Sequence, residues 1–514
     1  MATRRAFLEL IGAAGTGLAL AGCAASPALR RLALPGMGID DLPYLGLARS
    51  LTVEHDTLVR VEGALPPELR GTLYRNGPGL FDRAGLRKRC IMDGDGMIQS
   101  FAFQARDVRY RNRFVRTKKF QEEEGAGKFI YPSWSTQAPG GLLGNAFKAD
   151  AIQSQASVTV YHRNDRLLSF DDTGQPWELD PESLETRGET RLGLAPGESI
   201  YSAHAKRDPR TGEWLHFGVE YGPKPKLHLT SFHASGALKT HRVLPMPRYV
   251  YIHDWFVSER HVVFVFHPVR FAFVGFLLGR RSMLDSLRWE PKEGNLLWVL
   301  PREGEAAPIA LETEARFMWH SVNAFERGHD IVADFIGYRN PDHFIGPDPA
   351  VQAIMQGRRG GSFHPGELCR YLLDPAKKTV RTEVLDPGNL EWPRIDERRW
   401  GLPYRYAYMN GSRSGEFFWS TVRRWDMSTG RSEGYAFREG QYCGEPVFVP
   451  RPGVPADPSA ESAPGWLLTE VYGGHTQKSF LAVLDAERLP QGPMALVHLE
   501  HHAPLSYHGW WNPA

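Results

Sequence analysis

Short runs of alternating hydrophobic and polar residues, each ended by a turn signal, recur along the chain from about residue 50. The segments AKRDPRTGEWLHFGVEYG (205–222) and CRYLLDPAKKTVRTEVL (369–385) each contain two such runs around a polar turn. Alternation with a period of two that is interrupted by such a turn is typical of an antiparallel β-hairpin. The pattern therefore predicts an all-β chain that is built from successive hairpins.

Many hairpins in one long chain favour a β-propeller, which arranges its sheets around an axis and leaves few open edges. The 52 glycines and 38 prolines among the 514 residues also favour frequent turns over long helices. The hairpins are too irregular to give the number of blades. A pair of stacked β-sandwiches is the alternative architecture.

The N-terminal segment differs from this pattern and is typical of an export signal. Arg4 and Arg5 precede a weakly apolar stretch, and the sequence LAGC ends at Cys23. An arginine pair of this kind marks a twin-arginine signal, and LAGC resembles a bacterial lipobox. We expect residues 1–22 to be a signal peptide, Cys23 to be lipidated and 23–45 to be a tether, which places the protein on the periplasmic side. An ordinary N-terminal helix with a chance arginine pair is the alternative.

Charge and cysteine content exclude several classes of protein. The net charge of +2 argues against a nucleic-acid binder, which would carry a strong basic excess. After Cys23, the three remaining cysteines are widely spaced and form no C-x-x-C pair, so we expect free thiols at Cys90, Cys369 and Cys443. No apolar run reaches the roughly 18 residues that a membrane-spanning helix requires.

One apolar segment lies between arginines, with Arg270 before it and Arg280 and Arg281 after it. It is too short to cross a bilayer, but it could lie in the membrane interface with its arginines at the headgroups. A buried helix over one face of the propeller is the alternative. If the interfacial reading holds, its side chains would admit a lipid-soluble substrate, and we name them the access patch: Phe271, Phe273, Phe276, Leu277 and Leu278.

Four histidines share one setting, the boundary between an apolar strand and a turn. They are His204, His253, His320 and His508. In a propeller, residues at the starts of different blades can converge on the axis, and four imidazoles suit iron, copper, zinc or nickel. Taken singly, a histidine in such a setting is more often a buried residue without a special role.

Eight short motifs occur in order along the chain and carry a resemblance: GTLYRNGPG, MDGDGMIQSF, SAHAKRDPRTGE, IHDW, FMWHSVNAFE, EWPRIDERRWG, GEPVFVPRPG and YHGWW. Together they resemble the carotenoid cleavage oxygenase family, which includes apocarotenoid oxygenases and lignostilbene dioxygenases. The resemblance implies a seven-bladed propeller over residues 46–514, with a cap of helices and loops over the metal face.

The resemblance also implies an Fe(II) centre held by His204, His253, His320 and His508, one from each of four motifs. Three carboxylates that orient such imidazoles would be Glu391, Glu445 and Asp172. Many relatives have a glutamate where this chain has Asp172. Because aspartate is one methylene shorter, either the backbone comes closer to the histidine or a water bridges the gap.

The activity implied is that of a dioxygenase, which adds O2 across one double bond of a conjugated polyene and yields two carbonyl fragments. We expect a carotenoid or apocarotenoid substrate, because Phe114 stands where lignostilbene-cleaving members have a phenol-binding tyrosine. A stilbene-cleaving dioxygenase, an isomerase that uses the same iron and a propeller that binds pigment or lipid without turnover are the alternatives.

Overall fold

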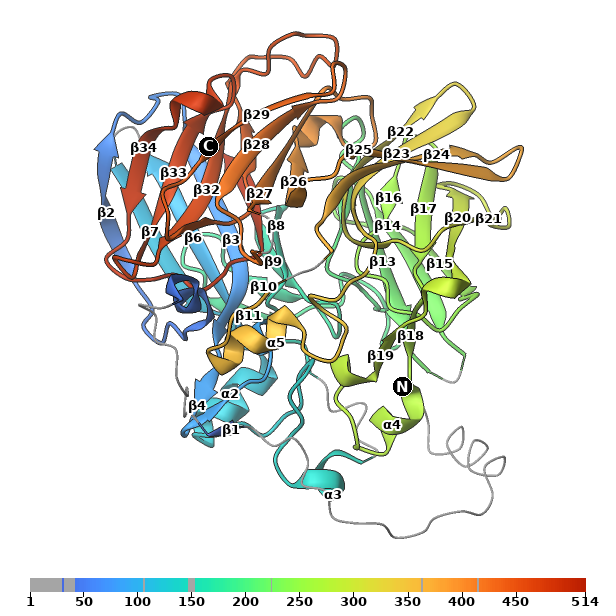
Figure 1. The fold of residues 1–514 in the computed structure, drawn as a ribbon, viewed down its shortest axis with the longest axis horizontal. Coiled ribbons are helices and arrows are strands. Elements are labelled where there is room, and N and C mark those ends of the chain that lie inside the picture. Colours follow the sequence, from blue (N-terminus) through green and yellow to red (C-terminus); the bar gives the residue numbers. More distant parts are fainter. Residues whose placement is uncertain are drawn as a thin grey trace.

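The computed structural model of the chain describes residues 30–31, 42–104, 107–146, 153–222, 224–361, 364–413 and 416–514. The predicted signal peptide and Cys23 lie outside the described residues, as does most of the predicted tether. From residue 42 onward the elements are almost all β-strands. The prediction of an all-β, propeller-like fold is therefore confirmed (Figure 1).

Five blades are separate four-stranded antiparallel sheets whose strands follow one another in the chain. Their first strands each form an edge of the sheet. The blades are β8–β11 (Thr159–Arg163, Arg166–Phe170, Trp177–Leu179, Thr186–Glu189), β12–β15 (Lys206–Arg207, Trp214–Glu220, Lys226–Phe232, Leu238–Pro245), β16, β17, β20 and β21 (Phe256–Val257, His261–Phe266, Asn295–Pro301, Ile309–Thr313), β22–β25 (Phe317–Arg327, Asp330–Tyr338, Glu367–Asp374, Thr379–Asp386) and β26–β29 (Asn389–Ile395, Tyr406–Ser412, Thr421–Asp426, Arg431–Ala436).

The remaining strands of the propeller form one ten-stranded sheet that joins the two ends of the chain. Its strands are β2 (Asp56–Gly63), β3 (Gly71–Leu80), β6 (Asp95–Gln104), β7 (Asp107–Phe114), β30 (Gln441–Cys443), β31 (Val447–Pro450), β32 (Gly465–Gly473), β33 (Lys478–Asp485), β34 (Pro493–His498) and β35 (His508–Pro513). The first half of β2 pairs with β7 and the second half pairs with β34, so β2 fuses what would otherwise be two sheets. The expectation of seven blades is therefore wrong for the described residues, which form five four-stranded blades and this continuous sheet.

Burial along the strands follows their position within a blade. β32 is buried at all nine of its positions, as expected for a strand that is covered on both faces. β15, the last strand of its blade, has no fully buried residue and contains only exposed and half-buried positions. Inner strands therefore supply the core, while outer strands have one face in solvent.

The inner strands contact their neighbours around the axis. β16 contacts β22, β22 contacts β26, and β35 contacts both β31 and β8. The starts of blades that are distant in sequence are thereby brought together, which is the arrangement that the spacing of the four histidines requires.

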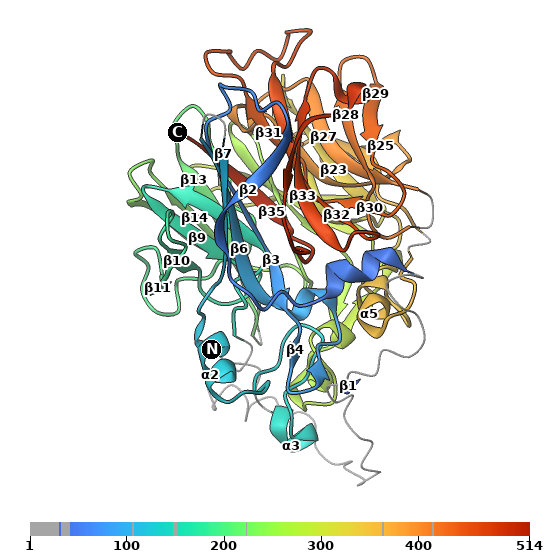
Figure 2. The same cartoon turned by 90° about the vertical axis from the view of Figure 1, so that its left-hand side faces the viewer.

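Short helices, 3-10 turns and loops lie together on one side of the sheets (Figures 1 and 2). These elements are α2 (Lys118–Gly125), α3 (Gly141–Asn145), α4 (Phe273–Leu277), α5 (Ala350–Ala353), η1 (Pro43–Ala48), η2 (Ile91–Asp93) and η6 (Ile354–Gln356), with the short strands β4 (Asp82–Arg83), β5 (Leu86–Arg87), β18 (Val269–Phe271) and β19 (Leu287–Trp289). Val351 of α5 and Ile354 of η6 belong to the same apolar cluster as Leu467 of β32, so the cap packs on the core of the sheets. Among the described residues, no helix has the length and apolar character to cross a bilayer.

Candidate metal centre

The four predicted histidines all lie at the inner edge of a sheet. His204 comes two residues before β12, and His253 comes three residues before β16. His320 lies within β22, at an irregularity of the pairing with β23 between Met318 and Ser321. His508 is the first residue of β35, where it pairs with Asn76 of β3. Four separate edge strands therefore deliver one imidazole each.

The structure brings these four imidazoles together. All four are buried, and one nitrogen from each lies within 4.8 Å of the corresponding nitrogen of every other. The Nε2 atoms of His204 and His253 are 3.0 Å apart. Two nitrogens that bind one ion at right angles, with bonds of about 2.1 Å, would be about 3 Å apart. The spacing of this pair therefore fits a shared ion.

Three of the four imidazoles have a carboxylate on their other ring nitrogen. Nδ1 of His253 is 2.8 Å from Asp172 Oδ2, Nδ1 of His320 is 2.6 Å from Glu391 Oε2, and Nδ1 of His508 is 2.9 Å from Glu445 Oε1. Because an ionised carboxylate only accepts hydrogen bonds, each Nδ1 carries the proton and each Nε2 is left bare. Glu391 and Glu445 thus occupy the places that the motifs gave them.

Asp172 reaches His253 directly, at 2.8 Å, so the shorter side chain needs no water to bridge the gap. The carboxylate also accepts the hydroxyl hydrogens of Tyr251 at 2.7 Å and of Ser202 at 3.0 Å. Burial alone would raise the pKa of Asp172, but the histidine and these two hydroxyls outweigh it and lower the pKa below the usual value. Asp172 therefore remains an anion opposite the proton of His253.

Glu391 and Glu445 are fixed in the same manner by backbone hydrogen bonds. The N–H of Trp392 donates to Glu391 at 2.5 Å, and the N–H of Gly509 donates to Glu445 at 2.7 Å. A carboxylate with a second donor is held in one rotamer, and it holds the imidazole ring in turn.

The protonation of the imidazoles is set mainly by burial. Burial lowers the pKa of His204 well below its usual value, although the nearby carboxylate of Asp254 opposes this shift, and burial does the same for His508. For His320, burial opposes charging, but the carboxylate of Glu391 outweighs it and raises the pKa. His204 and His508 are therefore neutral at pH 7, as metal ligands must be.

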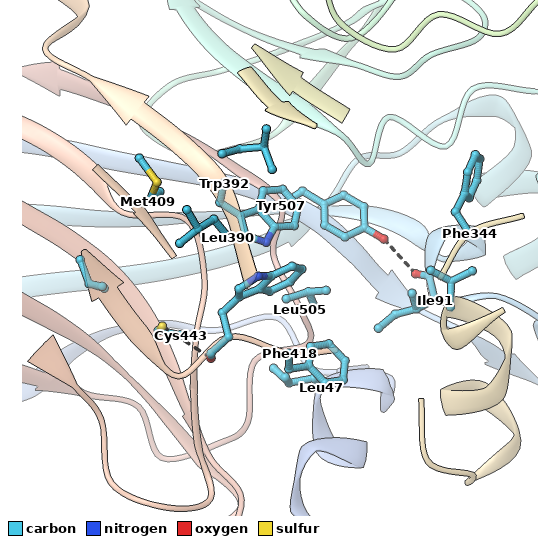
Figure 3. Close-up of a cluster of buried hydrophobic side chains, with 14 of the residues drawn as sticks. Leu47, Ile91, Phe344, Leu390, Trp392, Met409, Phe418, Cys443, Leu505 and Tyr507 are labelled. Carbon is cyan, nitrogen blue, oxygen red and sulfur yellow. Dashed lines mark hydrogen bonds between the residues drawn. The ribbon is translucent and has the colours of Figure 1, made fainter. Parts of the chain in front are cut away.

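Trp392 lies beside the histidines in a strained conformation. Its φ of 56° is in the left-handed region, at an irregularity of β26 next to Glu391. Its ring centroid is 5.1 Å from the centroids of both His320 and His508, and the indole stacks on Tyr507 (Figure 3). A bulky residue at positive φ is a costly feature that the surroundings must enforce, and such strain is concentrated at functional sites.

A cavity of about 110 Å³ lies beside the histidine cluster, and its wall includes three of the four histidines and the cap residues Ile91 and Val351. Its volume exceeds the roughly 10–15 Å³ that one water needs. The wall combines the site residues with aromatic and aliphatic side chains, and it includes Ile91, Met92, Trp134, Asp171, Asp172, His253, Trp319, His320, Tyr338, His343, Val351, Glu391, Trp392, Phe417, Trp419, Leu505, Tyr507 and His508. An apolar cavity with a few polar groups is typical of a site for a small hydrophobic ligand.

The access patch and Phe114 do not contribute to this wall. None of the five residues of the patch is among the side chains that line the cavity, and α4 is half-buried, with Val274 exposed. Phe114 packs instead against Phe120, 5.0 Å away, in a separate cluster. Neither the access patch nor Phe114 is therefore in the cavity wall.

Sequence reasoning missed His343 and Trp392, which line the cavity, because neither follows a pattern that marks a cavity wall.

Similar proteins of known activity match almost the whole chain. Apocarotenoid-15,15'-oxygenase from Synechocystis is 31% identical over 88% of this chain and 92% of its own length. Lignostilbene-alpha,beta-dioxygenase isozyme III from Sphingomonas paucimobilis is 27% identical over 91% of this chain and 95% of its own length. The crystal structure of the cobalt-substituted Synechocystis enzyme matches 92% of this chain and 99% of that one, with a TM-score of 0.85 and 30% identity.

The family profile described as retinal pigment epithelial membrane protein (RPE65) matches residues 48–513. That span contains all four histidines and the three carboxylates that orient them. The chain therefore belongs to the RPE65 family, that of the carotenoid cleavage oxygenases.

Proposed function

We propose that this protein is an Fe(II)-dependent dioxygenase that cleaves a carbon–carbon double bond of a carotenoid or apocarotenoid with O2. The single observation that carries the proposal is the convergence of four buried imidazoles, with ligand atoms within 4.8 Å of one another. Both oxygen atoms enter the two carbonyl products, so the reaction needs no further reductant.

A metal ion satisfies the nitrogen atoms of the four histidines better than hydrogen bonds between these histidines would. Nε2 of His320 is buried without a hydrogen-bond partner among the described residues, which is costly unless something else binds it. An N–H···N hydrogen bond could satisfy His204 and His253, but it would leave this third nitrogen unpaired. Four neutral imidazoles without cysteine suit iron, copper, zinc or nickel, and the resemblance to the carotenoid cleavage oxygenases favours iron among these.

Iron would supply the redox chemistry by which dioxygen reacts with a double bond, and the protein would supply position and exclusion of water. His204, His253, His320 and His508 would hold the ion. Asp172, Glu391 and Glu445 keep three of those rings in one tautomer and one orientation. The flat surfaces of Trp392 and Tyr507 in the cavity wall are suited to contact with a flat conjugated chain.

The substrate class is inferred from the relatives and from the wall of the cavity. Identity is higher to the apocarotenoid oxygenase than to the lignostilbene dioxygenase, at 31% against 27%. An apolar wall rich in aromatic side chains suits a polyene. Stilbene cleavage is the second candidate, because relatives that share 27% identity include both lignostilbene and isoeugenol oxygenases.

Iron-loaded protein should be incubated with a panel of apocarotenals and stilbenes, first without oxygen and then under 18O2. The proposal predicts no product in the first step and, in the second, two carbonyl fragments that each carry one labelled oxygen. Isomerised substrate without label would identify an isomerase instead. Bound but unchanged substrate under 18O2 would identify a binding protein.

Export, lipidation at Cys23 and peripheral membrane contact form a second part of the proposal. They are supported by Arg4, Arg5 and the LAGC sequence, and by the apolar access patch. A lipid anchor would keep the enzyme near the membrane that dissolves its substrate.

A further inference from the structure

Three buried nitrogen atoms with hydrogens point to an additional feature of the cavity. Nδ1 of His343 and Nε1 of both Trp392 and Trp419 are buried and have no hydrogen-bond partner among the described residues. All three residues line the cavity beside the histidine cluster. Indole nitrogens only donate, so Trp392 and Trp419 each require an acceptor.

The tautomer of His343 follows from its other ring nitrogen. Trp319 donates its indole N–H to Nε2 of His343 at 2.7 Å. Because Nε2 accepts this hydrogen, a neutral imidazole must carry its own hydrogen on Nδ1. Burial lowers the pKa of His343 to about 4, so the ring is neutral at pH 7. Nδ1 of His343 is therefore a third donor without an acceptor.

The position of His343 relates this donor to the metal centre. Trp319 contacts both His343 and the metal centre. The centroid of its ring is 4.9 Å from that of His253 and 6.3 Å from that of His343. On its other side, His343 lies 6.3 Å from Phe417, which is 5.9 Å from Trp419. Trp319 thus contacts both His343 and the histidine cluster, and the rings of His343 and Trp419 both lie beside Phe417.

We propose that this wall binds an oxygen atom of the ligand, with Nδ1–H of His343 as the principal donor and Trp419 as a second. The inference rests on the proposed function for the identity of the ligand as a polyene, and it adds that the polyene bears an aldehyde or hydroxyl group. A buried donor without an acceptor is destabilising, and a ligand oxygen relieves that cost while a hydrocarbon does not. His343 is a specificity-determining residue on this view, and it does not touch the reacting carbons.

Two substitutions at His343 distinguish loss of the hydrogen-bond donor from the change in side-chain shape. Asparagine places its amide nitrogen near the position of Nδ1 and can still donate, so His343→Asn should keep the preference for an oxygen-bearing ligand over a hydrocarbon. Glutamine reaches toward the position of Nε2 and can still accept from Trp319, but it has no donor near the position of Nδ1. His343→Gln should therefore lose the preference for an oxygen-bearing ligand. Trp419→Phe removes the second donor and keeps an aromatic ring.

Binding should be measured by quenching of tryptophan fluorescence with iron-loaded protein under anaerobic conditions, in which the proposed function predicts no turnover. The probes are a β-apocarotenal and its hydrocarbon analogue, in which CHO is replaced by CH3. We expect wild type to bind the aldehyde about 3- to 10-fold more tightly than the hydrocarbon, the amount one hydrogen bond contributes. His343→Gln should weaken aldehyde binding by a similar factor and leave hydrocarbon binding unchanged, and Trp419→Phe should act in the same direction.

Equal affinities of wild type for the two probes would overturn the inference, as would equal effects of His343→Gln and His343→Asn. Circular dichroism and Tm show whether each variant is folded, and His343→Asn serves as the matched comparison. The proposed function is tested separately by aerobic cleavage with iron-loaded wild type. A preference for the aldehyde without any cleavage would keep this inference and reject the dioxygenase.

Discussion

The Nε2 atoms of His204 and His253 face each other at 3.0 Å, although the two residues precede different blades. Asp172 holds the proton of His253 on Nδ1, so the nitrogen that faces His204 is a bare lone pair. Burial keeps His204 neutral. The fold thus brings the bare nitrogen of His253 close to a nitrogen of a neutral His204 in a buried site, together with a third nitrogen, from His320, that has no partner among the described residues. An ion that binds all of them explains why this arrangement is stable.

Loss of the Asp172 carboxylate should weaken the centre without changing its ligands. Asp172→Asn retains the size of the side chain but removes the charge that fixes His253, and we expect iron affinity or activity to fall about 10- to 100-fold. Iron titration followed by turnover measures both. Asp172→Glu is the matched control, because it keeps the charge and should retain more activity than Asp172→Asn. Equal losses in the two variants would contradict a role for the charge.

Acid should remove the contribution that Asp208 makes to the stability of the fold. Burial would raise the pKa of Asp208, but hydrogen bonds from Arg210 and from Arg302, at 2.7 Å, outweigh it and hold the pKa at about 2. A carboxylate with a lowered pKa stabilises the fold above its unfolded value of roughly 4, and that stability disappears as pH falls toward 2. Asp208→Asn should therefore lower Tm at pH 6, and the difference from wild type should shrink below pH 4.

Thermal unfolding at several pH values provides the measurement for Asp208. The expected loss in Asp208→Asn is about 1–3 kcal/mol at pH 6, as for a hydrogen bond to a charged group. A difference in Tm that stays constant from pH 6 to pH 3 would refute the assignment. Asp457→Asn is a suitable control, because that carboxylate is exposed and accepts its hydrogen bonds from Ser459 in its own loop.

Membrane contact by the access patch can be tested with two polar substitutions. Phe273→Asp together with Leu277→Asp should reduce activity on substrate in liposomes far more than on substrate dispersed in detergent, because only the first assay requires contact with a bilayer. Initial rates in the two assays give the comparison. If both rates fall by the same factor, the patch serves folding or binding instead of the membrane.

Export depends on the paired arginines in the proposed scheme. Arg4→Lys together with Arg5→Lys should keep the precursor in the cytoplasm, and Cys23→Ala should abolish lipid labelling of the mature chain. Cell fractionation and labelling with a radioactive fatty acid detect the two effects. Normal periplasmic delivery of the double-lysine variant would rule out the twin-arginine route.

Local patterns were sufficient for the strands and for the histidines. Hairpins such as the one around Asp208 are encoded by adjacent residues, so the alternation of apolar and polar positions predicted them. The sequence placed His204, His253, His320 and His508 at boundaries between a strand and a turn, but His320 lies inside β22. The motifs EWPRID and GEPVFVP gave Glu391 and Glu445, and the stretch SFDDTG gave Asp172.

Features that depend on distant partners were not predictable from such patterns. β2 divides its pairing between β7 and β34, and no local signal distinguishes that from an ordinary hairpin strand. His343 lies in an irregular loop between β23 and β24, and only the folded chain shows that Trp319 fixes its tautomer. The left-handed conformation of Trp392 likewise depends on its packing against His320 and His508.

The metal content of the purified protein tests the central claim most directly. After reconstitution with ferrous iron under anaerobic conditions, inductively coupled plasma mass spectrometry should find about one iron per chain in wild type and in His329→Ala, whose histidine is exposed and outside the cluster. His204→Ala, His253→Ala, His320→Ala and His508→Ala should each retain only a small fraction of that iron while remaining folded. Wild type without stoichiometric iron, or alanine variants that bind as much iron as wild type, would contradict a four-histidine metal centre.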